Sequence, residues 1–428
     1  MRAAIRERST LLRVTPGLVE SPGARPGHKG GRVRILVLAP HPFFQARGTP
    51  LAVKTVLEFL TGRGHQVDVL TFHEGENLEI ANCRIHRIGH LPWIRNIRPG
   101  LSVKKVICDL LMFVKCLRMV QKNRYDLIHA VEESAFIAAA MLSLTGVPYV
   151  YDMDSSLAEQ IVDAYPGLHF AFPALRRCEA LAVRRSLGVL TVCAALEDVA
   201  HGHAPDQPVG RVEDTTLLAP GAHSGNGQGS DTPLPTGVGS HSLVAMYVGN
   251  LERYQGIGLL LDGFRHTVAR VPNAHLVIVG GMDQDIERYR RRALQLGIVT
   301  QVHFLGPRPV TSLDGLLRRA DVLVSPRLKG LNTPMKIYSY LDSGTAVLAT
   351  RLRSHTQVLD DRTAYLVAPE PEALGNGLAH LLSDPGLRAR LGSQAKAYMQ
   401  QEFTPEAAQR KLSSFYTMME SKANGTRA

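Results

Sequence analysis

The chain has few of the features that define small secreted domains or membrane proteins. Its 428 residues include only five scattered cysteines, none of them in a Cys-x-x-Cys pair. These cysteines are Cys83, Cys108, Cys116, Cys178 and Cys193. An odd number argues against a complete disulfide framework and favours a reducing compartment. The longest apolar stretches are interrupted by charge well before the roughly 20 residues that a transmembrane helix needs.

The N-terminal segment also lacks a secretory signal. Residues 1–32 are basic but contain no apolar region of the roughly 7 to 15 residues that such a signal requires. They are predicted to form a flexible N-terminal tail, and an upstream start site would explain them equally well. The expected location is cytoplasmic, with peripheral contact at the inner face of the cell membrane as a further expectation.

Acidic residues are fewer than basic ones, and the net charge is +11. Such a charge favours an anionic partner, which could be nucleic acid, an acidic membrane surface or a phosphorylated substrate. The sequence has no zinc-finger spacing and no aromatic-plus-glycine signature of RNA-binding modules, so no nucleic-acid partner is expected. Membrane and phosphate remain as the candidate partners.

The length predicts two domains, and the pattern of elements predicts an α/β fold. Val33–Ala39 is a near-continuous apolar strand of the kind buried on both faces of a parallel sheet. A helix over Thr55–Arg63 and a strand over Gln66–Leu70 complete a β-loop-α-β unit, with which a doubly wound half begins. Further strands of this half are predicted at Leu127–Val131, Tyr149–Asp152 and Gly188–Val192.

A second strand-helix series follows a segment rich in Gly, Pro, Ser, Thr and His. Its strands are predicted at Leu243–Gly249, His275–Gly280 and Val302–Gly306. The predicted divisions are a tail over 1–32, a first Rossmann-like domain over 33–200, a linker over 201–242, a second Rossmann-like domain over 243–404 and a C-terminal segment over 405–428.

The stretch Ala320–Thr350 concentrates the strongest functional signal. Asp321–Ser325 has the length and composition of a buried strand, and Thr333-Pro334 is typical of a helix start. Gly344 predicts the end of that helix, and Ala346–Ala349 the next strand. The result is a βαβ unit, and such units bind ligands at the carboxyl ends of their strands.

The start of this helix is predicted to bind phosphate. Its N-terminal N–H groups and its dipole favour an anion. Arg327, Lys329 and Lys336 add positive charge near the same point.

The pattern Pro334-x-Lys336-x-x-Ser339-Tyr340-Leu341 with Gly344 resembles the donor-site helix of retaining glycosyltransferase family 4. The resemblance extends over almost all of residues 33–420. It implies the GT-B fold, in which two doubly wound Rossmann-like domains face a cleft, and it implies that the last helical segment crosses back to the first domain.

The resemblance also implies a nucleotide-sugar donor. Its donor-binding residues are expected to be Gly48, Arg253, Arg327, Thr333, Lys336 and Ser339. In this assignment Arg253 and Lys336 bind the diphosphate and Ser339 contacts the ribose. The chain departs from the family at four positions, where it has Val131 for a histidine, Asn250 for an arginine, Gln255 for a lysine and Ser339 for a glutamate.

Two adjacent carboxylates are the candidate catalytic residues. Glu132 and Glu133 follow the strand Leu127–Val131, and loops at the carboxyl ends of such strands bind ligands. A carboxylate there could orient an acceptor hydroxyl or accept its proton. Asp152-Met153-Asp154 has a D-x-D form that could bind a divalent metal. No metal is expected, because GT-B enzymes generally bind donor phosphates with basic groups and helix dipoles.

A basic amphipathic helix is predicted within residues 92–124. Apolar residues recur at helical spacing from Val103 to Leu117, and lysines and arginines, Lys105 among them, supply the polar side. Such a helix could lie on an anionic membrane through residues 101–122, close to Trp93. The alternative is an ordinary helix packed on the sheet.

These observations favour a hexosyltransferase that uses a nucleotide sugar and needs no cofactor. The acceptor is expected to be a glycan, either lipid-linked or polysaccharide. The departures at the four family positions leave an alternative, a catalytically weak or inactive GT-B protein that serves as a binding or partner subunit. A nicotinamide-dependent oxidoreductase is excluded, because no G-x-G-x-x-G turn follows the first strand.

Overall fold

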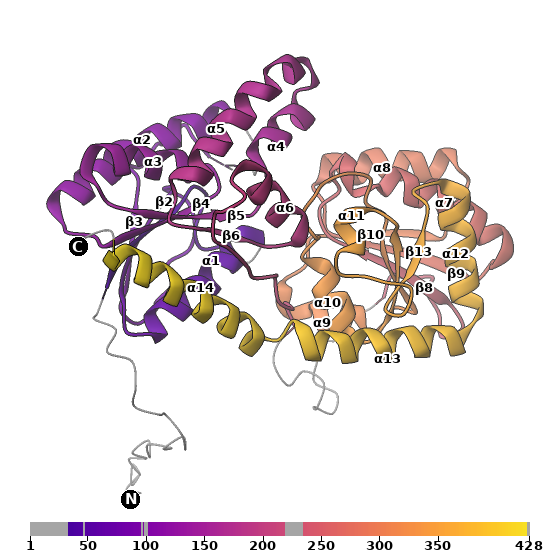
Figure 1. Ribbon diagram of the computed structural model, residues 1–428. Helices are drawn as coiled ribbons and strands as arrows, with labels where there is room; N and C mark the ends of the chain where they lie inside the picture. Colours follow the sequence, from indigo (N-terminus) through magenta and orange to yellow (C-terminus); the bar gives the residue numbers. More distant parts are fainter. Residues whose placement is uncertain (1–32, 46–47, 96, 98–101, 219–233, 426–428) are drawn as a thin grey trace, which may run out of the picture. The chain divides into compact units, whose positions relative to one another are not determined.

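The computed structural model describes residues 33–45, 48–95, 97, 102–218 and 234–425, with side chains to residue 422 (Figure 1). The predicted tail over 1–32 lies outside the described residues, as does the part of the predicted linker over 219–233.

The first domain is built on a parallel sheet of seven strands in the order β3-β2-β1-β4-β5-β6-β7. The strands are β1 (Arg34–Ala39), β2 (Gln66–Thr71), β3 (Cys83–Arg87), β4 (Leu127–Val131), β5 (Tyr149–Met153), β6 (Val189–Thr191) and β7 (Val209–Arg211). The reversal of order between β1 and β4 is the switch point of a doubly wound fold, at which ligands bind.

The second domain is built on a parallel sheet of six strands in the order β10-β9-β8-β11-β12-β13. Its strands are β8 (Leu243–Val248), β9 (Ala274–Val279), β10 (Val302–Gly306), β11 (Val322–Ser325), β12 (Ala346–Thr350) and β13 (Tyr365–Val367). The four central strands, β8, β9, β11 and β12, are mostly buried, because helices cover both faces of the sheet.

Helices enclose the first sheet on both faces. One apolar core joins the sheet to α2 (Val103–Lys122), α3 (Ser134–Thr145) and α5 (Phe172–Arg185). Another core joins it to α1 (Gly48–Gly62) and to the C-terminal helix α14 (Pro405–Gly425). The remaining helices of this domain are α4 (Leu157–Ala164), the 3-10 helix η1 (Pro166–Ala171) and α6 (Ala194–His203).

The second sheet is enclosed in the same way. One core includes residues of α7 (Ile257–Arg270), α8 (Asp283–Gln295) and α12 (Pro371–Ser383), and the other includes residues of α9 (Leu313–Leu317), α10 (Lys336–Ser343) and α13 (Pro385–Glu402). Short helical turns are η2 (Arg253–Gln255), η3 (Val310–Ser312) and α11 (Arg353–Thr356). The chain therefore forms two parallel-sheet α/β domains, and the predicted fold class is confirmed.

A buried hydrogen-bond chain fixes α14 to the first sheet. The hydroxyl of Tyr416 lies 2.6 Å from Nδ1 of His129 on β4, and Nε2 of His129 lies 2.9 Å from Oδ2 of Asp152 on β5. Because the carboxylate only accepts, Nε2–H donates to Asp152 and Tyr416 donates to Nδ1. All three side chains are buried, so the final helix is held by polar bonds as well as by its apolar face.

Several predicted boundaries differ from the structure. Helix α1 begins at Gly48 rather than Thr55. The strands β7 and β13 have only three residues each, and β3 is polar and only partly buried, so none of the three has the apolar run of a central strand. The predicted linker over 201–242 contains the end of α6 and β7 in its first part. Helix α10 begins at Lys336 rather than at Thr333-Pro334, and the Thr333 hydroxyl accepts a hydrogen bond from Gln357.

The substitution Tyr416→Phe tests the attachment of α14. It leaves Nδ1 of His129 buried without a donor, so we expect the free energy of unfolding in urea to fall by about 1–3 kcal/mol. Tyr398→Phe, which removes the hydroxyl of a half-buried tyrosine on α13, should change it much less. Equal effects of the two substitutions would contradict the role of this hydrogen bond.

Candidate functional site

Three loops meet at the carboxyl edge of the second sheet, and glycines allow their close approach. A Cβ at Gly280, after β9, would overlap the carbonyl oxygen of Gly249, after β8. A Cβ at Gly256 would overlap the carbonyl oxygen of Pro326, after β11. Each of these three glycines has a positive φ, which other residues rarely adopt. The backbone is therefore assembled tightly at the edge where such sheets bind ligands.

Lys336 lies at the start of α10, beside the loop that follows β8. Its Nζ is 3.1 Å from Oε1 of Gln255 and 3.8 Å from the ring centroid of Tyr247. A Cβ at Gly249 would lie 2.9 Å from the same Nζ, so this glycine makes room for the ammonium group. Burial and then the charge of Arg327 lower the pKa of Lys336 well below its usual value.

Arg327 organises the loop that follows β11. Its guanidinium donates to the carbonyl oxygens of Lys329 (2.5 Å) and Asn332 (2.8 Å) and to Oδ1 of Asn332 (2.9 Å). The side chain is 6% exposed, and its burial lowers its pKa. Its Cζ lies 5.3 Å from the ring centroid of Tyr254. Among the described residues, neither Arg327 nor Lys336 forms an ion pair with a carboxylate.

A neutral histidine holds this loop to β12. Nδ1 of His355 donates to the carbonyl oxygen of Thr350 at 2.7 Å, and Nε2 accepts from the hydroxyl of Ser325 at 2.9 Å. The Thr350 hydroxyl in turn donates to the carbonyl oxygen of Arg327 at 2.6 Å. Burial lowers the pKa of His355 to about 4. An uncharged ring is therefore built into the support of the loop.

The other predicted donor residues of this domain differ in exposure. Arg253 lies exposed in η2. Thr333 is buried, and its Oγ1 accepts from Nε2 of Gln357 at 2.9 Å. Ser339 is 1% exposed, and its Oγ accepts from the backbone N–H of Leu217 at 3.0 Å. Lys336, Arg327 and Arg253 therefore lie on the adjoining loops, while Ser339 is covered by the segment at Leu217.

The remaining predicted residues lie at the carboxyl edge of the first sheet. Gly48 begins α1 with φ +43°. Glu132 follows β4 with φ +48°, and its Oε1 accepts from the hydroxyl of Ser155 at 3.4 Å. Glu133 lies 2.5 Å from Nζ of Lys105 on α2. Burial raises the pKa of Glu133 to about 8, although Lys105 opposes this shift.

The pairing of Lys105 with Glu133 corrects one expectation about α2. Lys105 was predicted on the polar, solvent-facing side of the helix, but it is buried. The buried side of α2 consists of Cys108, Met112, Cys116, Met119 and Val120. Most residues of the predicted apolar side from Val103 to Val114 are exposed, as a helix that lies on a membrane would require.

Carboxylates gather near Glu132 at this edge. Asp154 follows β5, and burial together with Asp152, Glu132 and Asp214 raises its pKa well above its usual value. A raised pKa weakens Asp154 as a ligand for a cation, because metal binding requires the ionised carboxylate. Within the described part of the chain, no three His, Cys, Asp or Glu side chains are arranged to hold a metal ion.

Several residues of the second-domain edge were not predicted to have a role. Tyr247 lies beneath the ammonium group of Lys336, Gln255 holds that group, and His355 with Thr350 supports the loop. In the sequence, Gln255 stands out only because it lacks the charge of the family's lysine. Tyr247 stands directly before Val248-Gly249 at the end of a strand, and a tyrosine in that position is equally typical of a strand in the core.

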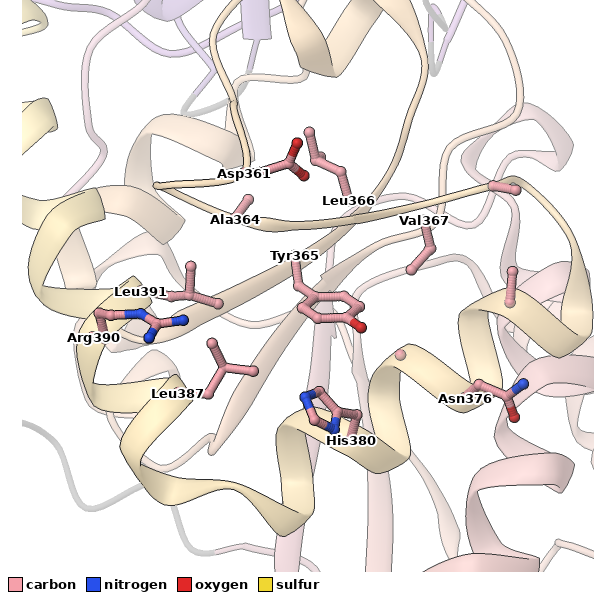
Figure 2. A pocket seen from close by; sticks show the side chains of 13 residues that line it. Asp361, Ala364, Tyr365, Leu366, Val367, Asn376, His380, Leu387, Arg390 and Leu391 are labelled. Atoms are coloured by element: carbon pink, nitrogen blue, oxygen red, sulfur yellow. The ribbon is translucent and has the colours of Figure 1, made fainter.

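A cavity of about 630 Å³ lies elsewhere on the second domain, beside the edge strand β13. Figure 2 shows Tyr365 of β13 near His380 of α12, with Asn376 and Arg390 at the two ends of the cavity. None of the predicted site residues lines it.

Comparison with known proteins identifies the chain. Residues 236–398 match the family described as glycosyl transferases group 1, and residues 47–212 match the glycosyl transferase 4-like domain. The chain belongs to the group 1 glycosyltransferases. Its fold is GT-B, and it is an enzyme that transfers a sugar.

Two relatives show the range of similarity. A D-inositol 3-phosphate glycosyltransferase of Corynebacterium glutamicum is 26% identical over 381 residues, which cover 83% of this chain and 88% of the relative. A phosphatidyl-myo-inositol mannosyltransferase of Mycolicibacterium smegmatis is 31% identical over 163 residues, which cover 37% of this glycosyltransferase and 41% of the relative.

Solved structures share the fold. Sucrose-phosphate synthase from Thermosynechococcus elongatus has a TM-score of 0.74 at 20% identity, covering 91% of this chain and 100% of that protein. HepE from Anabaena, in complex with UDP-glucose, has a TM-score of 0.67 at 16% identity, covering 90% of this chain and 100% of that protein. At these identities the similarity concerns the fold alone.

The low pKa of His355 predicts a dependence of stability on pH. Its pKa of about 4 lies below the value of 6.5 for a free histidine, so the unfolded chain binds more protons between these values. Stability is therefore lost as pH falls from 6.5 to 4, by about 3 kcal/mol from this residue. The difference in unfolding free energy between wild type and His355→Gln should shrink over this range, and a constant difference would contradict the assignment.

Proposed function

We propose that this glycosyltransferase moves a hexose from a nucleotide sugar to a lipid-linked or polysaccharide acceptor, with retention of the anomeric configuration. The observation that carries the proposal is the half-buried Lys336 beside the buried Arg327 at the carboxyl edge of the second sheet, without a carboxylate partner among the described residues. A buried charge without a partner is unfavourable, so this site favours an anion. The diphosphate of a nucleotide sugar supplies one.

The site would act by stabilising the leaving group. Negative charge develops on the diphosphate as the glycosidic bond breaks, and donors that are already positioned stabilise it most. Lys336 is held in place by Gln255 and Tyr247, and the exposed Arg253 could add a forked contact. A ribose would reach Ser339 only if the segment at Leu217 moved away from it.

The two predicted catalytic carboxylates have different surroundings. Glu133 is paired with Lys105, whereas Glu132 accepts a long hydrogen bond from Ser155 and has no salt bridge among the described residues. We therefore assign Glu132 to orienting the acceptor hydroxyl and Glu133 to holding α2 against the sheet. No cofactor takes part in this scheme.

The surface of α2 supports an acceptor in a membrane. Val103, Val106, Ile107, Leu110 and Val114 recur at helical spacing and are exposed, with Val103 at 79% and Leu110 at 64%. Lys104, Arg118 and Lys122 are also exposed on this helix. An exposed apolar stripe with basic flanks is typical of a helix that lies in the interface of an anionic membrane. No helix in the described part of the chain has the length and apolar content to span a bilayer.

The departures from the family at Asn250 and Gln255 favour a second candidate, a catalytically weak GT-B protein that acts as a binding or partner subunit. Calorimetry with a panel of nucleoside diphosphate hexoses, combined with a nucleotide-release assay, separates the two functions. Donor binding with turnover supports the enzyme. No binding and no turnover across the panel would support the partner subunit.

The substitution Lys336→Met tests the diphosphate site. We expect donor affinity to fall about 10- to 100-fold, as for the loss of a charge-assisted hydrogen bond. Because the pKa of Lys336 is lowered, an anion should also cause proton uptake on binding, which calorimetry in buffers of different ionisation enthalpy measures. Lys396→Met on α13 is the matched control and should change neither quantity. Unchanged affinity in Lys336→Met would refute the site.

The double substitution Val106→Ser and Leu110→Ser tests the surface of α2. It removes two exposed apolar side chains, so we expect binding to vesicles of phosphatidylcholine and phosphatidylglycerol to weaken by about tenfold or more. Leu294→Ser, at an exposed leucine of α8 in the other domain, is the control. Equal sedimentation of wild type and double variant with these vesicles would exclude α2 as the contact.

A further inference from the structure

The helical hairpin formed by α4, η1 and α5 has an apolar tip. Figure 1 shows α4 and α5 side by side, with η1 joining them. No residue of η1 is buried. Phe170 is 82% exposed, and Tyr165 and Leu168 are exposed beside it in the sequence. Three large apolar side chains that are exposed together at one turn are typical of a surface that binds a protein or a membrane.

A cavity lined by arginines lies on α5 beyond this tip. It has a volume of about 330 Å³ and is lined by Pro173, Arg176, Arg177, Ala180 and Arg184 of α5 and by His203 of α6. The positions on α5 recur at intervals of three and four, which places them on one side of the helix. The lining contains three guanidinium groups and no carboxylate.

The neighbouring hydrogen bonds keep the cavity positively charged. Glu179, the acidic residue of α5, is buried and accepts from the hydroxyl of Ser156 at 3.0 Å and from the N–H of Leu157 at 2.7 Å. It also lies 2.9 Å from Nε2 of His203. Arg184 is positioned by a bond from its Nε to the carbonyl oxygen of His203 at 2.9 Å. Glu159 of α4 is the acidic side chain that acts electrostatically on Arg176.

We propose that this cavity binds the phosphate of an anionic lipid, while the tip of the hairpin inserts into the bilayer. Guanidinium groups match phosphate oxygens with pairs of parallel hydrogen bonds. The Cζ of Arg176 lies 6.0 Å from the ring centroid of Phe172, which is two residues along the chain from Phe170 of the apolar tip. A ligand with a phosphate next to an acyl chain meets both surfaces, whereas a free phosphate meets only the first.

The position of the hairpin agrees with this partner. Helices α2, α3 and α5 pack in the same core against one face of the first sheet, so α5 shares that face with the exposed apolar stripe of α2. Leu181 of α5 is also exposed. The proposal deepens the membrane contact proposed above and rests on that part of the proposed function, but it adds a separate element and a binding site for the headgroup.

Flotation with vesicles tests the cavity. We expect the double substitution Arg176→Gln and Arg177→Gln to weaken binding to phosphatidylcholine–phosphatidylglycerol vesicles about 30-fold, since each basic residue near an anionic surface contributes about a fivefold factor. The matched control is Arg265→Gln with Arg270→Gln on α7, which also removes two exposed arginines and should leave binding within about twofold of wild type. Equal losses in the two variants would overturn the site and indicate a general charge effect.

A fluorescent probe at the tip locates the insertion. Trp93 is the single tryptophan of the chain, so Trp93→Phe combined with Phe170→Trp places the indole in the hairpin alone. We expect its emission to shift to shorter wavelength with phosphatidylglycerol-containing vesicles, and the shift to disappear with Arg176→Gln and Arg177→Gln. No shift in a protein that still binds the vesicles would overturn the insertion of the tip.

Three further outcomes separate a lipid from a soluble phosphate, the hairpin from α2, and binding from no binding. If glycerol 1-phosphate in solution competes with the vesicles at equal phosphate concentration, the ligand is a soluble phosphate and the lipid assignment is wrong. If the α2 variant loses vesicle binding while the Arg176 and Arg177 variant keeps it, the hairpin proposal fails and the membrane contact of α2 stands. If wild type binds no vesicle, both fail.

Discussion

Two cations, the half-buried Lys336 and the buried Arg327, have no carboxylate partner among the described residues, and they constrain the carboxyl edge of the second sheet. Lys336 and Arg327 are placed where a carboxylate would ordinarily be needed, and polar and aromatic groups hold them instead. Such an arrangement costs free energy in the absence of a ligand. The tight glycine turns, the neutral His355 and the hydrogen bonds of the Arg327 loop keep the two charges in position. A ligand with negative charge would therefore relieve an existing strain in the electrostatics.

The departures from the family acquire a structural meaning in this setting. Gln255 occupies a position where a lysine is usual, and in this chain its amide oxygen accepts a hydrogen bond from Lys336. The neutral amide of Gln255 therefore positions Lys336, where the family usually has a second positive charge. Ser339 is shorter than the usual glutamate, and the segment at Leu217 covers it. In this chain the edge is arranged around Lys336, with fewer charges and a smaller side chain than the family pattern has at these positions.

The first domain exposes large apolar side chains to solvent on α2 and on the hairpin of α4, η1 and α5. The helix α2 turns its cysteines and methionines to the core and pairs Lys105 with Glu133, while Val103, Leu110 and their neighbours on the same side face outward. Exposed apolar surface on two elements of one face is unusual for a protein that meets only water. The arginines of α5 give that face a positive charge.

The sequence alone determined the two parallel sheets and the family. Apolar strands such as Leu127–Val131 can be predicted from composition, since both faces of a central parallel strand are buried. The family pattern from Pro334 to Gly344 can be recognised because all its residues lie within one short segment. Short edge strands such as β7 and β13 gave no signal. Tertiary structure decided which face of α2 is buried, how Gln255 and Tyr247 hold Lys336, and where the arginines of α5 gather. These depend on contacts between residues far apart in the chain, which local periodicity cannot encode.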